Sequence, residues 1–428
     1  MNIQTAPPAA KPRTPAETAL IDSFADRMGD LPGNGDVVVA RDAALESLKE
    51  NGIPSRRVES WHYTDFRTLL KGVAPFDTSA GTQALPALIA GSSIVAASNG
   101  VALAANAPQG VSLTPVREAL ADGSLVTQLR SRGGFDDTIG QINAAYVSDG
   151  WMVSIADGTE LEAPLELQNI QKAGQGHTRF PVRIGANVKA TIVERQNGGE
   201  GDAFSTSVNH VTVGDGAEIL WVILRDFGQA TQLSQFNATM GKGSRLTLYI
   251  INAGGKLVRQ EVHVNVAGED SDFELRGLNL LADDSHTDVT MTVGHLVENT
   301  RSTEIVRNVV KDRARGVFQG GMIRVAQIAQ KTDARMACNT LLLSDEGEFD
   351  AKPELEIFAD DVACGHGATV TELSKDYLFY LMARGIPENE ARGLLIKAFI
   401  AEIIEELEDE TLVEALEEVL SNWLASHA

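Results

Sequence analysis

One short pattern recurs through the middle of the chain and restricts the folds that it can adopt. An apolar, alternating stretch closes on glycine five times, at Val182–Gly185, Val211–Gly214, Ala238–Gly241, Val264–Gly268 and Met291–Gly294. The glycines are 29, 27, 27 and 26 residues apart, and further β-rich runs such as Glu218–Leu224 follow them. A nearly constant step of this size is typical of a solenoid, in which stacked coils complete one shared core.

The pattern predicts two strands and two turns in each coil, with side chains that alternate between a core face and an outer face. A right-handed parallel β-helix is the first prediction. A β-sandwich of meandering hairpins is the alternative, since short strands with regular turns also fit that fold. The recurring glycines are expected to form turns with positive φ. Helical segments at both ends are expected to cover the strand edges of the terminal coils.

The N-terminal part has the signals of a mainly helical region. Residues 1–13 are rich in Ala and Pro and are predicted to be disordered. Thr14 to Glu17 combine an N-cap, a proline at the first helical position and a capping-box glutamate. A second helix is expected over Arg41–Glu50, ending at Gly52. Residues 14–140 are therefore assigned to an N-terminal, mainly helical domain.

The C-terminal part is also predicted to be helical. Helices are expected over Glu372–Arg384, Glu388–Leu407 and Glu410–Leu424, with Gly385 and Pro387 separating the first two. The last helix carries one apolar stripe that should face a core. The prediction is thus a mainly β fold with helical flanks, divided into a β-helix core over 141–370 and a C-terminal helical domain over 371–428.

Composition excludes some function classes. The formal net charge of −23 should repel nucleic acid and anionic lipid surfaces. No run of about 18 apolar residues is present, so no membrane span is predicted. The N-terminus lacks the apolar region of a signal peptide, and two cysteines in so long a chain favour buried thiols in a reducing compartment. A cytoplasmic location is therefore expected.

Motifs of catalysis are lacking in the sequence. Gly241-Lys242 and Gly255-Lys256 do not have the surroundings of a phosphate-binding loop, and the usual signatures of serine hydrolases, zinc proteases and thiol oxidoreductases are not found. What remains is Cys364-Gly-His366-Gly, whose thiol and imidazole would share one face of a strand. They could ligate a soft or borderline metal, with a second subunit, or Cys338, His286 or His295, completing the site. A buried Cys beside a structural His is the alternative.

Longer stretches resemble the SufB/SufD family of iron–sulfur cluster assembly proteins. The resemblance is carried by Leu355–Val370 around Cys364 and His366, by Leu378–Ile386 and by Asn339–Ser344. Near the N-terminus, Arg57–Asp65 matches the family pattern, as does Asn143–Gly150 further on. The resemblance covers about residues 54–408, and the Cys-Gly-His-Gly-Ala-Thr run is similar to the SufD branch of the family rather than to the SufB branch.

The resemblance implies a non-catalytic scaffold rather than an enzyme. It implies pairing with SufB through the β-helix and contact with two copies of the ATPase SufC through helices at about 372–426. His366, and secondly Cys364, would lie near the SufB interface, where iron or an iron–sulfur cluster would be held transiently and no cofactor stably. Two other classes stay open. One is a structural homodimer without metal. The other is a carbohydrate-active solenoid with acid and base at Asp283-Asp284 and Asp360-Asp361.

Overall fold

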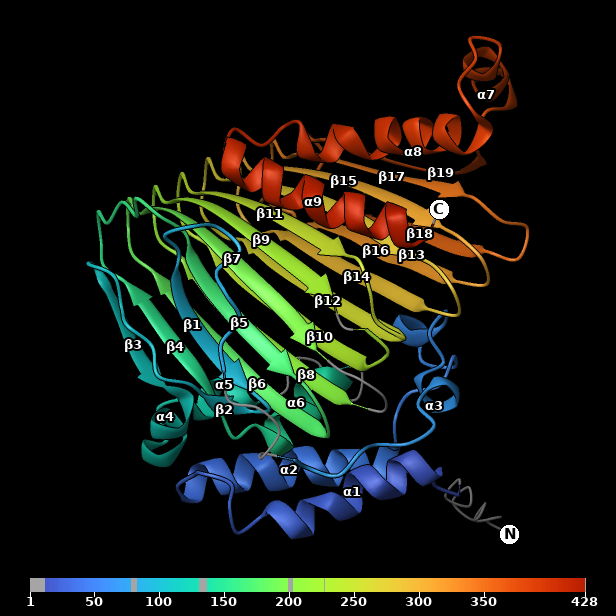
Figure 1. Ribbon diagram of the computed structural model, residues 1–428. Helices are drawn as coiled ribbons and strands as arrows, with labels where there is room; N and C mark the ends of the chain where they lie inside the picture. Colours follow the sequence, from blue (N-terminus) through green and yellow to red (C-terminus); the bar gives the residue numbers. More distant parts are fainter. Residues whose placement is uncertain (1–11, 78–82, 131–136, 199–202, 227, 428) are drawn as a thin grey trace, which may run out of the picture.

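The computed structural model describes residues 12–77, 83–130, 137–198, 203–226 and 228–427. It is mostly β-structure with helices at both ends (Figure 1). The strands are β1 Ser93–Ser98, β2 Val101–Ala102, β3 Val111–Pro115, β4 Asp149–Ile155, β5 Leu165–Gln171, β6 Gln175–Ile184, β7 Lys189–Gly198, β8 Phe204–Val213, β9 Glu218–Asp226, β10 Thr231–Met240, β11 Arg245–Asn252, β12 Leu257–Val266, β13 Asp272–Leu281, β14 His286–His295, β15 Arg301–Val310, β16 Arg315–Val325, β17 Asp333–Leu342, β18 Glu348–Ile357 and β19 Ala363–Glu372.

Helices precede and follow these strands. They are α1 Pro15–Arg27, α2 Gly35–Asn51, the 3₁₀-helix η1 Glu59–Trp61, α3 Phe66–Leu69, α4 Val116–Asp122, α5 Val126–Leu129, α6 Thr138–Tyr146, α7 Lys375–Met382, α8 Glu388–Ile404 and α9 Glu410–Ser426. The capping box predicted at Thr14 and Glu17 is present, and α2 ends at Gly52 as expected. Most of residues 1–13, predicted to be disordered, lies outside the described residues. None of the helices described is long and apolar enough to cross a bilayer.

The strands form a parallel β-solenoid, which confirms the predicted fold class. From β4 onward, even-numbered strands build one sheet and odd-numbered strands the other, each strand pairing in parallel with the strand two positions further on. Each coil therefore gives one strand to each sheet. A sandwich of meandering hairpins would pair consecutive strands in antiparallel fashion, so the structure excludes that alternative.

The recurring glycines serve a purpose other than the predicted one. Gly185, Gly214, Gly241 and Gly268 do not have positive φ, and Gly294 lies inside β14 instead of in a turn. The positive φ falls two residues before the next strand, at Asn187, Gly216, Gly243 and Asp270. The glycines are required because coils stack closely there.

The closest of these approaches is at Gly268. A Cβ on Gly268 would lie 2.1 Å from the carbonyl carbon of Gly241, one coil below. Gly214 would likewise bring a Cβ within 2.5 Å of the backbone of Gly185. Real Cβ atoms do not approach backbone that closely, so the coils can stack at these turns only if the residues there are glycine.

The space between the two sheets is filled mainly by apolar side chains, and a polar column runs along the odd sheet within it. Val, Ile, Leu and Phe residues of both sheets form the main core. Within it, Asn252, Asn279 and Asn308 lie on consecutive odd strands and hydrogen-bond to one another at 2.6 and 2.7 Å. The column continues to Thr340 and Cys338, where the Asn308 amide lies 3.0 Å from the Thr340 hydroxyl and 3.4 Å from the Cys338 thiol.

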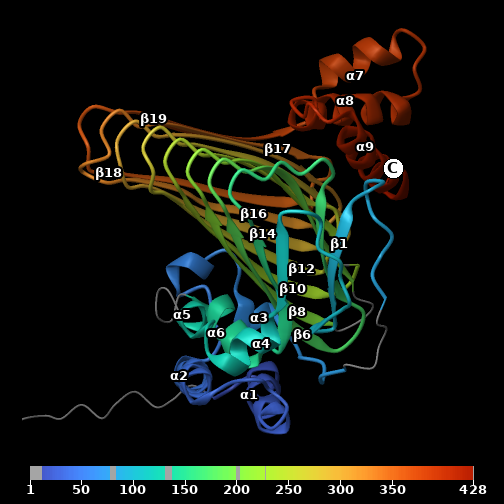
Figure 2. The ribbon, with the colours of Figure 1, turned by 90° about the vertical axis from the view of Figure 1, so that its left-hand side faces the viewer.

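The flanking helices cover different sheets (Figure 2). Helices α1, α2 and α6 pack on the outer face of the even sheet, on residues such as Phe204 and Leu233. Helices α8 and α9 pack on the outer face of the odd sheet, with Ile400, Leu412 and Leu416 buried there. The division of the chain into domains stays a prediction. The region assigned to the helical N-terminal domain does contain β1, β2 and β3, which join the two sheets.

The two ends of the solenoid differ. At the N-terminal end, the short strands β2 and β3 pair in antiparallel fashion with β1 and β4 and close both sheets. At the C-terminal end, β18 and β19 are the outermost strands, and no described strand pairs with their outer edges. We call this C-terminal end, formed by β18 and β19, the open end.

Candidate functional site at the open end of the solenoid

The Cys-Gly-His-Gly motif lies on β19, the last strand of the odd sheet. The strand pairs only with β17 within the described residues, and His366 is exposed while Cys364 is half-buried. The N–H of Ala363 donates to Thr332 at 2.9 Å, so alternate residues of β19 bond inward to β17. The N–H and C=O groups of residues 364, 366, 368 and 370 then point to the free edge.

Both side chains of the motif face the interior of the solenoid, as the spacing predicted. Cys364 packs against the main core, and His366 pairs in register with the core residue Met336. The imidazole therefore lies where the core reaches the open end. A thiol and an imidazole at this position are accessible from solvent and continuous with the buried interior.

Cys338 lies close to this pair on the neighbouring strand. It points into the same interior, one strand below and two positions along from Met336, the residue paired with His366. Burial raises the pKa of the Cys338 thiol to about 12, and burial also raises the pKa of Cys364. Since thiolates are the metal-binding form, both residues are protonated thiols unless a metal displaces the proton.

A buried carboxylate, Glu304, lies on the same column of the sheet. Register places Glu304 of β15 beside Met336 of β17, which is beside His366 of β19. Its side chain is fully buried, and neither carboxylate oxygen has a hydrogen-bond partner among the described residues. Burial raises its pKa to about 8, a shift that the nearby Ser302 hydroxyl partly offsets although it does not reach hydrogen-bond geometry. Glu304 was not predicted as a site residue. An acidic residue at an inward position of an alternating strand is the signal that could have identified it.

The other predicted ligands have different partners. His295 is buried, and its two ring nitrogens lie 2.8 Å from the Thr300 hydroxyl and 3.1 Å from the Ser302 hydroxyl. His286 lies on the outer face of the even sheet and contacts Thr64 at 2.9 Å. Burial lowers the pKa of both imidazoles to about 4. Neither joins Cys364 and His366, and the described residues hold no group of three His, Cys, Asp or Glu side chains arranged for a metal.

The carboxylates of the carbohydrate-active alternative are also separated. Asp283 and Asp284 follow an odd strand, whereas Asp360 and Asp361 follow an even strand. These turns lie at opposite edges of the sheets, roughly 30 Å apart for strands of ten residues. Asp284 pairs with Arg313, and Asp361 pairs with Lys331. An acid–base pair must lie within about 10 Å, so the structure excludes this pairing.

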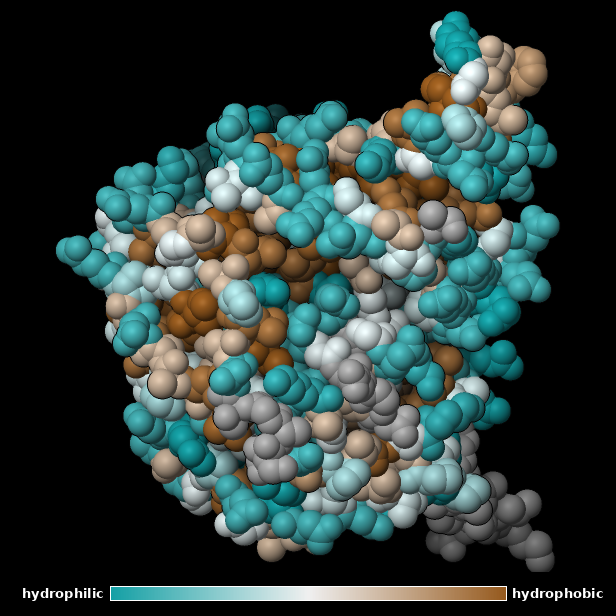
Figure 3. Space-filling model, viewed as in Figure 1, coloured by the Kyte–Doolittle hydropathy of each residue, from teal (hydrophilic) through white to brown (hydrophobic). Residues whose placement is uncertain are grey.

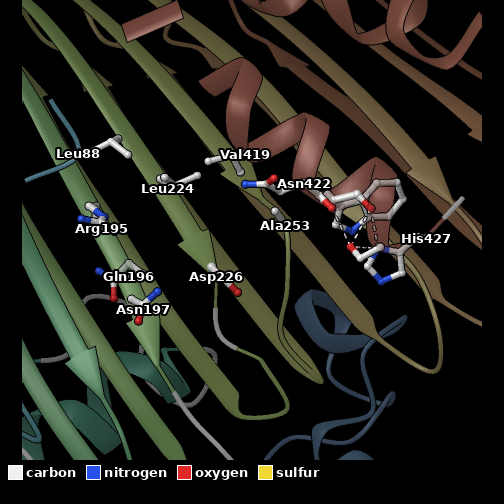
Figure 4. A pocket seen from close by; sticks show the side chains of 12 residues that line it. Leu88, Arg195, Gln196, Asn197, Leu224, Asp226, Ala253, Val419, Asn422 and His427 are labelled. Atoms are coloured by element: carbon white, nitrogen blue, oxygen red, sulfur yellow. Dashed lines mark hydrogen bonds between the residues drawn. The ribbon is translucent and has the colours of Figure 1, made fainter. Parts of the chain in front are cut away.

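A pocket beside α9 lies away from this chemistry (Figure 4). It has a volume of about 350 Å³ and is bounded by α9 and the outer face of the odd sheet. Its one imidazole, His427, stacks on Trp423 at 4.7 Å and bonds to the Trp423 carbonyl. These contacts hold the end of α9 in place and give no function to the pocket.

Comparison with known proteins agrees with the motif at the open end. The family model described as "SUF system FeS cluster assembly, SufBD core domain" matches residues 168–399, more than half of the chain. The chain belongs to the SufBD family. Its members are proteins of iron–sulfur cluster assembly, and the match spans the solenoid from β5 to β19 together with α7 and most of α8.

Individual SufBD relatives show the same placement. An iron–sulfur cluster assembly SufBD family protein of Synechocystis is 29% identical over 66% of this chain and 65% of its own length, just under two thirds. The iron–sulfur cluster assembly protein SufD of Escherichia coli is 27% identical over 86% of this chain and 88% of its own length. Protein ABCI7, chloroplastic, of Arabidopsis thaliana is 26% identical over 90% and 86%.

Proposed function

We propose that this SufBD protein is a SufD-type scaffold subunit, without catalytic activity of its own, in a SUF assembly complex. The observation that carries the proposal is the open end, where two strand edges that no described strand covers lie beside a solvent-accessible Cys364 and His366. Exposed edges of long strands are a hazard for a free protein, because other strands pair with them. A related solenoid, SufB, would cover them by continuing both sheets.

The second contact surface is on α7. None of its residues is buried, and Tyr377, Phe379 and Tyr380 are exposed by 67%, 73% and 54%. Figure 3 shows apolar atoms gathered over this part of the molecule, at the upper right. A cluster of exposed aromatic residues marks a protein-binding surface. We assign the SufC ATPase to α7, because α8 and α9 already bury their apolar faces on the odd sheet.

Cys364 and His366 would act as the metal-proximal residues of the interface. Thiolate and imidazole suit iron and iron–sulfur clusters, and two ligands from one chain leave the remaining positions to SufB or to the cargo. The chain would hold iron or a cluster only transiently, as substrate. The two unpaired thiols fit a reducing compartment such as the cytoplasm.

Co-expression with SufB and SufC tests the proposal. Size-exclusion chromatography with light scattering should give one copy of this chain, one SufB and two SufC. His366→Ala should leave this assembly intact and lower the iron bound by the anaerobically purified complex, whereas Phe379→Ala should release SufC alone. A chain that elutes free of both partners, or as a homodimer through the open end, would contradict the proposal.

A further inference from the structure

The segment that contains η1 and α3 is divided between anchoring residues and residues that line a groove. Trp61 is buried beneath the guanidinium of Arg259, 3.8 Å from its ring centre, and Thr64 bonds to His286 and Asp288. These contacts fix residues 54–70 on the even sheet. The segment lies beside the solenoid (Figure 1), and Arg56, Arg57 and His62 remain exposed.

Cations from two parts of the chain meet in this groove. Arg56 and Arg57 line it together with Arg313 and Arg315, around a cavity of about 870 Å³. An adjoining cavity shares Leu69, Asp284 and His286 with it and adds Lys71 and Lys256. We call these two cavities the basic groove. Its lining has six cations and three carboxylates, those of Asp65, Asp284 and Asp350. With Glu348, which lies 3.8 Å from Arg315, four carboxylates face the six cations, an excess of two positive charges in a chain of net charge −23.

Two arginines of the groove, Arg313 and Arg315, are oriented by neighbouring carboxylates. Asp284 binds Arg313 through two hydrogen bonds of 2.7 and 3.1 Å, and Asp350 binds Arg315 at 2.7 and 3.2 Å. Each pair fixes one edge of a guanidinium group and leaves its other N–H donors for a further anion. Arg56, Arg57, Lys71 and Lys256 form no ion pair within the described parts of the chain.

We propose that the basic groove is a binding site for a small phosphate-bearing ligand. Arginine forks match phosphate oxygens in pairs, and the volume falls in the range of small-molecule sites. The exposed rings of His62 and the half-buried Tyr63, which meet edge to face at 4.9 Å, add a surface for a planar group. The site lies on the outer face of the even sheet, away from β19, and its existence does not depend on the proposed scaffold role.

Calorimetric titration of the full chain with pyrophosphate tests this site. Binding should be detectable at low ionic strength and should weaken at least tenfold in Arg56→Gln/Arg57→Gln. The matched control is Arg183→Gln/Arg245→Gln, which removes the same charge from exposed strand positions outside the groove and should weaken binding less than twofold. Thermal melting of both variants should equal that of the original chain.

Titration with adenosine diphosphate separates the sources of the phosphate. Tighter binding than that of pyrophosphate indicates an organic phosphate with a planar ring, and equal binding indicates recognition of phosphate alone. Failure of the unaltered chain to bind either compound at millimolar concentration would overturn the proposal. So would an equal loss of affinity in the control variant, since the effect would then come from net charge.

Discussion

The two ends of the solenoid differ in how their outermost strand edges are covered. The N-terminal end closes both sheets with the short antiparallel strands β2 and β3, whereas no described strand pairs with the outer edges of β18 and β19 at the open end. Buried carboxylates of the interior also differ. Near the closed end, Glu194 is buried with hydrogen bonds from Gln196, Asn209 and Trp221. Towards the open end, Glu304 is buried with no hydrogen bond from the part of the chain that the structure describes.

This difference indicates that the closed end is complete as a folded unit and that the open end is shaped for a partner. Long unpaired edges are normally shortened, bulged or covered, and a buried polar group normally has its hydrogen bonds. Within the described residues, both departures occur together towards the end that carries Cys364 and His366. Buried atoms without a hydrogen bond nearer the closed end, such as Asn209 Oδ1 and Ser205 Oγ, belong to neutral side chains, whereas Glu304 carries a carboxylate. Departures from these rules tend to cluster at functional sites.

Proline substitution should give the largest difference in stability between a strand inside the sheets and the free edge of β19. Ala238 lies in β10 between two paired strands, so Ala238→Pro removes a ladder hydrogen bond inside the core and should prevent folding. Ala368→Pro affects an N–H that faces the free edge of β19 and should change the melting temperature by only a few degrees, while it abolishes the complex with SufB. Circular dichroism melts and light scattering measure the two effects, and equal damage from both variants would remove the distinction.

Burial raises the pKa of both buried carboxylates, Glu194 and Glu304, so both should make stability depend on pH. Burial holds the pKa of Glu304 near 8 in the folded chain, against about 4.3 when unfolded. The unfolded state therefore binds fewer protons between these values, and the free energy of unfolding should fall by up to about 5 kcal/mol as pH rises through this range. Denaturant unfolding at pH 5 and pH 8 should show that Glu304→Gln reduces this dependence.

The matched variant at the closed end is Glu194→Gln. It replaces an acceptor bound by three donors, so it should destabilise the chain by about 1–3 kcal/mol at pH 5. Because burial also raises the pKa of Glu194, this variant should reduce the pH dependence as well. A pH slope in Glu304→Gln equal to that of the original chain would assign the dependence to other groups.

Glycine-to-alanine substitution should lower the free energy of unfolding more at the stacked turns than at the open end, although by less than the proline substitution above. Gly268→Ala brings a Cβ to 2.1 Å from backbone and should destabilise the chain by roughly 1–3 kcal/mol. Gly365→Ala has no atom within 4 Å of the new Cβ and should change stability by less than about 0.5 kcal/mol. Urea denaturation measures both, and a large effect at Gly365 would show that β19 is more enclosed than described.

The smallest expected effect on stability is at α7. Phe379 is 73% exposed, so Phe379→Ala should cost less than about 0.5 kcal/mol. Leu416→Ala, which opens a cavity beneath α9, should cost about 2–4 kcal/mol. The same denaturation experiment compares them, and a loss of stability at Phe379 would argue that α7 packs on the chain itself.

The strand alternation, the coil repeat, the helix caps and the shared face of Cys364 and His366 could all be predicted from sequence, because each is a local periodic signal. The strands at 93–115 were not predicted. They have six, two and five residues, and β1 ends in Ala-Ala-Ser, so their alternation is weak. The stacking role of Gly268 and the missing partners of Glu304 were not predicted either. Both depend on which residues of the neighbouring coils lie above and below, and the sequence of one strand does not determine this register.

Hydrogen exchange of residues 348–372 tests the central claim most directly. In the isolated chain, amides on the free edge of β19 should exchange rapidly while those of β10 are protected. On forming a complex with SufB, the amides of His366, Ala368 and Val370 should become protected. A stable complex that leaves exchange in β18 and β19 unchanged would show that the open end is not the interface and would contradict the account.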